Sequence, residues 1–107
     1  MSIFDIFIAY VTWGDNGKKR PVLILDQTSD DVTVFNITTQ YEGKSESVRN
    51  NYFKINDWSL AGLNKESYID TNNTVTLSLS SVDVNHPIGV LTEADIKRLV
   101  EFLSDKI

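Results

Sequence analysis

The chain has no cysteine, and its 107 residues include only one histidine and two prolines. Without cysteine there is no disulfide framework, no thiolate nucleophile and no zinc–thiolate site, which suits a reducing compartment. No apolar run approaches the roughly 18 residues that a membrane helix needs. Segment 1–13 is apolar, but it has no basic start and Asp5 interrupts it. We therefore expect a strand there rather than a signal peptide, and a cytoplasmic protein with no membrane partner.

Positive charge is also in deficit. Ten Lys and Arg residues stand against fifteen Asp and Glu residues, which gives a net charge of −5 and a sequence pI near 4.6. This balance argues against binding nucleic acid through bulk charge, although it leaves room for a local basic site. The 41% hydrophobic content is typical of a folded chain, and the length predicts one domain over 1–107.

Apolar and alternating segments predict a series of short strands, at 3–12, 21–25, 31–38, 52–55, 67–69 and 75–80, with 82–84 continuing the last one past a bend. Turn residues occupy 13–19 and 71–73, and the polar segment 41–51 is expected to be a loop. Segment 56–63 is expected to form a turn or a brief helical stretch.

One helix is expected at the C-terminal end. Thr92 is a good N-cap, and Glu93 and Asp95 suit the positive end of the helix dipole. An apolar stripe follows at helical spacing, made of Ile96, Leu99, Val100, Leu103 and Ile107, with Lys97 and Arg98 opposite. Many short strands followed by one helix predict a mainly β fold, a small bent antiparallel sheet or barrel with the helix against it.

Three of the ten basic residues are consecutive, Lys18, Lys19 and Arg20, directly before the strand that begins at Pro21. The guanidinium of Arg20 is always charged and offers a planar fork to phosphate or carboxylate, while the two lysines add point charges. The alternative is a solvated hairpin turn whose cations guard a strand edge.

Two hydroxyls and an amide, from Thr38, Thr39 and Gln40, close the strand 31–38. Thr38 is able to hold a phosphate oxygen or an attacking hydroxyl, although threonine is also an ordinary strand residue. His86 lies before a proline near a turn, and we expect it to be structural or exposed rather than an acid–base residue. The carboxylates form no spaced metal motif. Some aromatic residues are candidates either for stacking on unpaired bases or for the core: Tyr10, Trp13, Tyr41, Tyr52 and Trp58.

Four landmarks together resemble the MazF/PemK (Kid-like) toxin family: Arg20-Pro21 leading into Val-Leu-Ile-Leu, Ile37-Thr-Thr-Gln40, the segment 57–67 (DWSLAGLNKES) and the segment 88–95 (IGVLTEAD). They span nearly the whole chain in the family's order. The resemblance implies an SH3-like small barrel of the MazF/PemK (CcdB-like) type with a C-terminal helix, usually a homodimer. Leu60, Leu63 and the helix face offer apolar surface for such a dimer.

The resemblance also implies an activity. Members of the family are toxins of type II toxin–antitoxin systems, and they cleave single-stranded RNA at short sequences without a metal or another cofactor. The family's catalytic arginine corresponds to Arg20 and its catalytic hydroxyl to Thr38, with Lys18, Lys19, Thr39 and Gln40 as RNA-binding or phosphate-binding neighbours. The expected partners are RNA and an antitoxin whose disordered tail covers the RNA groove.

The chain departs from the family in having Phe4-Asp5 where Gly-Asp is usual, a short first loop and an acidic balance. Two other interpretations therefore stay open. One is a non-catalytic or gyrase-targeting binding module on the same fold, and the other is a plain dimeric structural domain.

Overall fold

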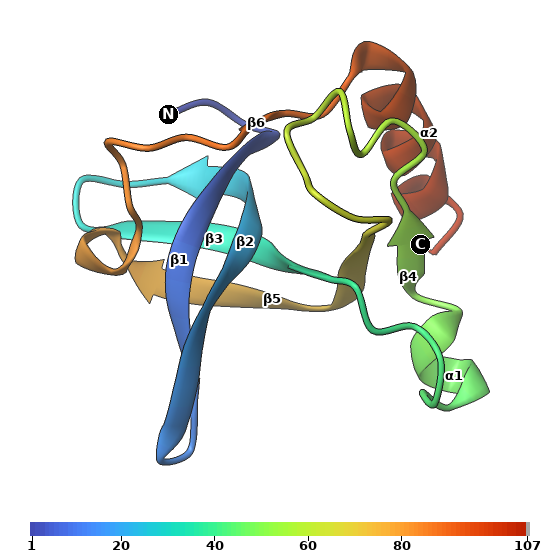
Figure 1. The fold of residues 1–107 in the computed structure, drawn as a ribbon, viewed down its shortest axis with the longest axis horizontal. Helices are drawn as coiled ribbons and strands as arrows, with labels where there is room; N and C mark the ends of the chain where they lie inside the picture. The colour runs from blue at the N-terminus through green and yellow to red at the C-terminus, as the bar shows by residue number, and fades with distance from the viewer. Residues whose placement is uncertain (107) are drawn as a thin grey trace.

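The computed structural model describes residues 1–106, in which a curled antiparallel sheet carries a helix at its C-terminal end (Figure 1). The strands of this part of the chain are β1 (Asp5–Trp13), β2 (Asn16–Gln27), β3 (Asp31–Thr38), β4 (Tyr52–Lys54), β5 (Tyr68–Ser78) and β6 (Gly89–Val90). Their order in the sheet is β4-β5-β3-β2-β1-β6. The helices are α1 (Glu46–Arg49), α2 (Glu93–Ser104) and a 3₁₀ turn at Leu79–Ser81. The expectation of a mainly β fold with a C-terminal helix is confirmed.

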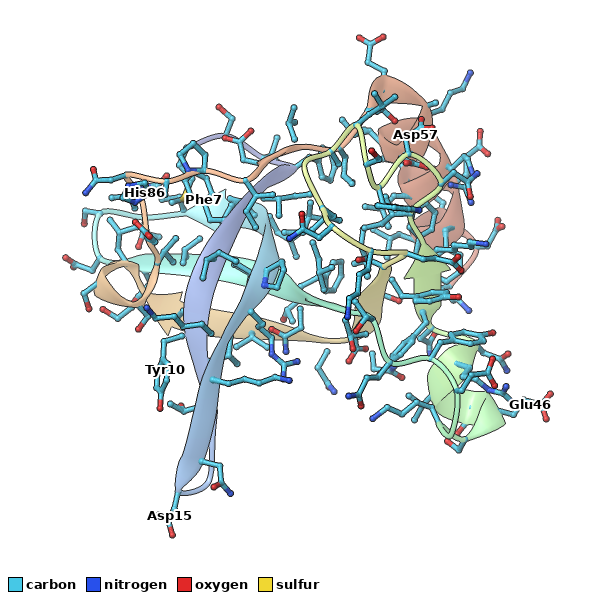
Figure 2. All side chains as sticks on the ribbon, viewed as in Figure 1. Phe7, Tyr10, Asp15, Glu46, Asp57 and His86 are labelled. Carbon is cyan, nitrogen blue, oxygen red and sulfur yellow. The ribbon has the colours of Figure 1, made fainter. Side chains whose placement is uncertain are left out.

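The first two strands form a long hairpin that reaches away from the sheet, with Asp15 at its tip (Figure 2). They pair from Ile6↔Leu23 to Trp13↔Asn16, so only Gly14 and Asp15 form the turn. Gly14 has a φ of +56°, which a glycine adopts without strain at the first central position of a hairpin turn. The predicted loop at 13–19 was therefore wrong, because pairing with β1 extends β2 through its polar first residues.

Alternation along the strands divides the buried side chains between the two faces of the sheet. In β3, Phe35 and Ile37 join the cluster that packs against α2, whereas Val32 and Val34 join a second cluster with β1 and β2. The predicted alternation of 31–38 is confirmed, and both faces of the strand carry buried residues. A strand in the middle of a curled sheet is covered on both faces. Apolar side chains are therefore needed at both sets of alternate positions.

Strand β5 runs through 71–73, where a turn had been expected. Its pairing with β3 jumps from Asn36↔Asp70 to Val34↔Val75, so residues 71–74 bulge out opposite one residue of β3. The Thr71 hydroxyl donates to the Asn51 carbonyl at 2.7 Å, which ties the bulge to the preceding segment. A bulge of this kind bends the strand without ending it.

Segment 41–51 is more ordered than the loop that its composition predicts. It contains α1, whose N-cap Ser45 accepts a hydrogen bond from the Val48 backbone N–H. The Asn72 side chain donates to the Val48 carbonyl at 3.1 Å and accepts from Asn51 at 3.2 Å. These contacts hold α1 against the bulge of β5, beside β4 (Figure 1).

Two landmarks of the sequence meet in a close backbone crossing. A Cβ built at Gly62 meets the Ile88 carbonyl oxygen at 2.3 Å, and one built at Gly89 meets the Ala61 carbonyl oxygen at the same distance. Gly62 also has a φ of +91°, which L side chains rarely adopt. Glycine is thus required at both places for 61–62 and 88–89 to pack together.

Side-chain hydrogen bonds fasten the same two landmarks to the start of α2. Thr92 caps the helix by accepting from the Asp95 backbone N–H, as predicted, and its hydroxyl donates to the Asp57 carboxylate at 2.9 Å. The Asp95 carboxylate, only 1% exposed, accepts from the backbone N–H groups of Asn56 at 3.2 Å and Asp57 at 2.8 Å. Asp95 therefore does more than favour the helix dipole, because it orders the turn at 56–57.

The buried side of α2 differs in part from the predicted stripe. Leu99 is fully buried and Ile96, Phe102 and Leu103 pack on the core, but Val100 is 48% exposed. Phe102 takes its place by packing edge-on against Phe53, with ring centroids 5.5 Å apart.

Lys97 is exposed, as expected. Arg98 was wrongly placed opposite the core, since its guanidinium lies 4.7 Å from the centroid of the Phe53 ring. Ile107 lies outside the described residues.

The proposed dimer surface also needs one correction, because Leu63 is only 8% exposed and belongs to the core, whereas Leu60 is 78% exposed. No helix within residues 1–106 has the length and apolar character to cross a membrane.

Candidate functional site

The separation of β2 from β3 creates a cleft at the end of their pairing. The last paired residues at this end are Val22 and Asn36, and continuing the register by two residues sets Arg20 opposite Thr38. Residues opposite each other in an antiparallel pair point to the same face. Beyond Asn36 the walls of the cleft enclose a cavity of about 160 Å³, here called the basic pocket, which is lined by Lys18, Lys19, Arg20, Pro21, Ile37, Thr38, Thr39, Gln40 and Ser67.

The basic pocket brings together all six residues to which the sequence analysis gave a catalytic or phosphate-binding role. Arg20 and Thr38 lie on its walls, with the neighbouring lysines on one side and Thr39 and Gln40 on the other. Because β2 starts at Asn16, Lys18 and Lys19 are carried by a paired strand rather than by a loop, which restricts the motion of their backbone.

Ser67 is a lining residue that the sequence analysis did not select. It is 2% exposed, and its hydroxyl donates to the Lys65 carbonyl at 2.8 Å. That bond and its burial give it a structural part, in shaping the turn before β5. Its place at the end of the 57–67 landmark was the only signal in the sequence that could have found it.

The charged residues that line the basic pocket are Lys18, Lys19 and Arg20, which are all cations and all lie on β2. None of the described residues that line it carries a carboxylate or an imidazole. The field of Arg20 reaches β4: partial burial and the charge of Asp70 raise the pKa of Tyr52, and the cation of Arg20 lowers it. Two lysines and an arginine on the wall of this cleft make it a place for an anion such as a phosphate.

The hydroxyl of Thr38 is oriented by the chain that follows it. Its oxygen accepts from the Gln40 backbone N–H at 3.1 Å, a local bond typical of threonine where a strand ends. A hydroxyl that accepts such a bond keeps its own O–H as a donor. Thr38 thus offers a positioned donor to a ligand oxygen in the cleft.

Two larger hollows adjoin the basic pocket. One, of about 420 Å³ and here called the tyrosine hollow, is lined by Thr39, Gln40, Tyr41, Glu42, Glu66 and Tyr68. The other, of about 250 Å³, is lined by Ile8, Pro21, Thr39, Leu63, Asn64, Lys65, Ser67 and Ile88. Thr39 lines all three, so the two hollows lie beside the basic pocket, and the three together are here called the groove.

Some of the candidate aromatic residues lie at the groove, and others lie at the core or elsewhere on the surface. Tyr41 lines the tyrosine hollow and Tyr52 packs beside it, with ring centroids 6.2 Å apart. Trp58 packs against the core, and Tyr10 is 47% exposed on β1 outside the lining residues of these cavities. The side chain of Trp13 lies outside the described part of the chain. Tyr68, which the sequence analysis passed over, completes the aromatic group.

His86 is not among the residues that line the groove, and it lies on the loop before β6 (Figure 2). Its side chain is 81% exposed, and its ring Nδ1–H donates to the Asp83 carboxylate at 3.0 Å. That hydrogen bond lowers the pKa of Asp83. The expectation of a structural or exposed histidine is confirmed.

Comparison with known proteins finds similarity among solved structures. No family model matches the chain, and no curated protein matches it. Among solved structures, the Mycobacterium tuberculosis toxin MazF-mt6 is similar to it at 28% sequence identity and a TM-score of 0.70, over 94% of this chain and 93% of that one. A likeness over more than nine-tenths of both chains confirms the resemblance to the MazF/PemK family that the four landmarks indicated.

Proposed function

We propose that the chain is the toxin of a type II toxin–antitoxin system and that it cleaves single-stranded RNA in the cytoplasm. The observation that carries the proposal is the basic pocket, in which Arg20 and Thr38 face one cleft at the end of the β2–β3 pairing. The likeness to a MazF toxin over the whole chain supports the same activity.

RNA supplies its own nucleophile for this reaction, the ribose 2′-OH. The 2′ oxygen forms a bond to the adjacent phosphorus while the bond from phosphorus to the 5′ oxygen breaks. The nucleophile loses its proton and the leaving oxygen gains one, so the products are a 2′,3′-cyclic phosphate and a 5′-OH end. In the transition state additional negative charge collects on the phosphoryl oxygens, and a fixed cation stabilises that state more than the ground state.

Arg20 is the residue suited to that electrostatic task. Its guanidinium stays charged at all ordinary pH values, so it acts as a stabiliser before it acts as a proton donor. A single well-placed donor of this kind contributes on the order of 10²–10³ in rate. Thr38 donates its O–H to the phosphate or holds the 2′-OH in line, and Lys18, Lys19, Thr39 and Gln40 bind the flanking chain. The general base is left unassigned.

We further propose an antitoxin as the protein partner, with a segment that covers the groove and thereby excludes RNA. The chain is also proposed to act as a homodimer. The cations of the basic pocket support the first proposal, because an acidic segment complements them. The exposed Leu60 supports the second.

Controlled expression in bacteria tests the proposal. We expect the wild-type chain to arrest growth, Arg20→Ala to relieve the arrest, and Lys97→Ala to arrest growth like the wild type, because Lys97 is an exposed cation on α2. Circular dichroism of the purified variants checks that each is folded. Normal growth with abundant wild-type protein contradicts the proposal, and arrest with intact RNA but broken DNA favours the gyrase-targeting alternative.

A further inference from the structure

Three tyrosines from different parts of the chain meet beside the basic pocket. Tyr41 and Tyr68 stack with ring centroids 4.5 Å apart and an interplanar angle of 16°. Tyr52 packs against both at a tilt, with centroids 6.2 Å from Tyr41 and 6.4 Å from Tyr68. All three are only partly buried, so aromatic surface is left at the wall of a hollow rather than sealed in the core.

This aromatic wall is held in place. The guanidinium of Arg49, on α1, lies 5.5 Å from the centroid of the Tyr41 ring. Tyr52 and Tyr68 are carried by paired strands, with Tyr52 opposite Asp70 and Tyr68 opposite Thr38. Rings that are already held by a paired strand or by an arginine lose little conformational freedom when a ligand stacks on them. Ligand binding therefore has a small entropic cost at this wall.

The register joins the aromatic wall to the proposed reaction centre. Tyr68 on β5 pairs directly with Thr38 on β3, and Thr39 and Gln40 line both the tyrosine hollow and the basic pocket. The tyrosine hollow is therefore within reach of the group next to a phosphate that lies between Arg20 and Thr38.

The charge of the tyrosine hollow decides what that group is. Glu42 and Glu66 line it, and partial burial together with the hydrogen bond and charge of Glu66 and the charge of Glu42 raises the pKa of Tyr68. Two carboxylates repel a second phosphate but accept hydrogen bonds from N–H groups. An aromatic wall with carboxylate acceptors suits a nucleobase.

Glu66 is positioned for such a contact. The Tyr68 hydroxyl donates to its Oε1 at 3.2 Å, and the Lys54 ammonium lies 3.3 Å from the same oxygen. Both contacts involve Oε1, so Oε2 is the oxygen better placed for a ligand. Guanine presents two adjacent donors on one edge, N1–H and the N2 amino group, which match a carboxylate. The Watson–Crick edges of adenine and cytosine each offer one amino donor beside a ring nitrogen that accepts hydrogen bonds. A carboxylate is itself an acceptor, so it repels that ring nitrogen.

We propose that the tyrosine hollow is a nucleobase subsite that selects guanine next to the scissile phosphate. The base stacks on the Tyr41–Tyr68 wall, and its N1–H and N2 amino group donate to Glu66. The inference rests on the proposed function, which places the scissile phosphate in the neighbouring basic pocket. It adds the identity of the base that the groove recognises.

Equilibrium binding to RNA analogues that resist cleavage tests the subsite by itself. The probes are dye-labelled pentamers of 2′-O-methyl uridine whose central base is guanine, inosine, adenine or uracil, and the readout is fluorescence anisotropy. Inosine keeps the N1–H of guanine and lacks only its N2 amino group. We expect guanine to bind on the order of 10-fold more tightly than inosine, and adenine and uracil to bind more weakly than guanine.

Two variants with matched controls locate the effect. Glu66→Gln is expected to remove the preference for guanine over inosine while leaving the uracil pentamer unchanged. Tyr68→Leu is expected to weaken the guanine pentamer on the order of 10-fold through lost stacking. Glu101→Gln, on α2, and Tyr10→Leu, on β1, make the same chemical changes outside the tyrosine hollow and are expected to bind like the wild type.

The outcomes separate the subsite from the proposed cleavage. Equal affinity for all four pentamers, or a base preference that Glu66→Gln does not alter, overturns the subsite even where binding still depends on Arg20. Failure of every pentamer to bind overturns it too. Guanine selection that depends on Glu66, in a protein that cuts no RNA, supports the subsite and rejects the cleavage.

Discussion

The buried carboxylate of Asp95 gives the sharpest test of how the two landmarks at 57–67 and 88–95 are joined. Replacing it in Asp95→Ala leaves two backbone donors, at Asn56 and Asp57, without their acceptor. Each hydrogen bond to a charged group contributes about 1.5–3 kcal/mol. Asp95 also forms an ion pair with Arg98. Because the Arg98 side chain is 41% exposed and therefore screened by water, this pair adds at most about 1 kcal/mol.

These bonds share one acceptor and are not fully additive, so we expect Asp95→Ala to lower the free energy of unfolding by about 3–5 kcal/mol. That is a large part of the roughly 5–15 kcal/mol that holds a small domain together. Urea unfolding followed by tryptophan fluorescence and circular dichroism measures it. Glu93→Ala, an exposed acid in the same helical turn, is the control and is expected to cost less than about 1 kcal/mol through the helix dipole. A loss below about 1 kcal/mol for Asp95→Ala refutes the reasoning.

Three further results are expected. Gly62→Ala lowers the free energy of unfolding by at least about 2 kcal/mol in the same urea assay, because its Cβ collides with the Ile88 carbonyl at a left-handed φ; a change under about 0.5 kcal/mol contradicts that crossing. Burial raises the pKa of Tyr68 above 10, with help from Glu66, so Glu66→Gln lowers that pKa in a tyrosine NMR titration and an unchanged value counts against the contact. Since the folded pKa is raised, the stability that it contributes is present below pH 10 and is lost as pH rises through the folded pKa. Cleavage of RNA continues in EDTA; strict dependence on a divalent ion points to another mechanism.

Elements with a complete local signal were predictable from the sequence. Strand β3 alternates without interruption, and α2 has a capping threonine followed by apolar residues at helical spacing. Signals of this kind depend on neighbours in the chain, so they survive folding unchanged. The N-cap at Thr92 and the start and end of β3 were confirmed for that reason.

The errors arose where distant segments decide the backbone. Thr71-Asn72-Asn73 has the composition of a turn, but its hydrogen bonds to Asn51 and Val48 make it a bulge inside β5. The first residues of β2 are polar and carry no apolar period, yet pairing with β1 extends the strand to Asn16. Neither partner could be identified from the local sequence.

The candidate site was half predictable for the same reason. Arg20 and Thr38 stood out because each lies where a strand meets a polar segment, and antiparallel neighbours bring such ends together. The tyrosine hollow was not foreseen, because Tyr41, Tyr52 and Tyr68 come from a loop and two strands that only the fold assembles. Sequence reasoning therefore selected residues of the basic pocket and missed the surface beside it.

The central claim is that Arg20 and Thr38 cleave RNA through the 2′-OH, and direct assay of the purified protein on an unstructured RNA tests it. The account predicts fragments with 2′,3′-cyclic phosphate and 5′-OH ends, at a rate that Arg20→Ala lowers on the order of 10²–10³-fold. Arg20→Lys also loses most of the rate, because a point charge does not reproduce the bidentate fork. Cleavage by Arg20→Ala at the wild-type rate, or fragments with 3′-OH and 5′-phosphate ends, would contradict the claim.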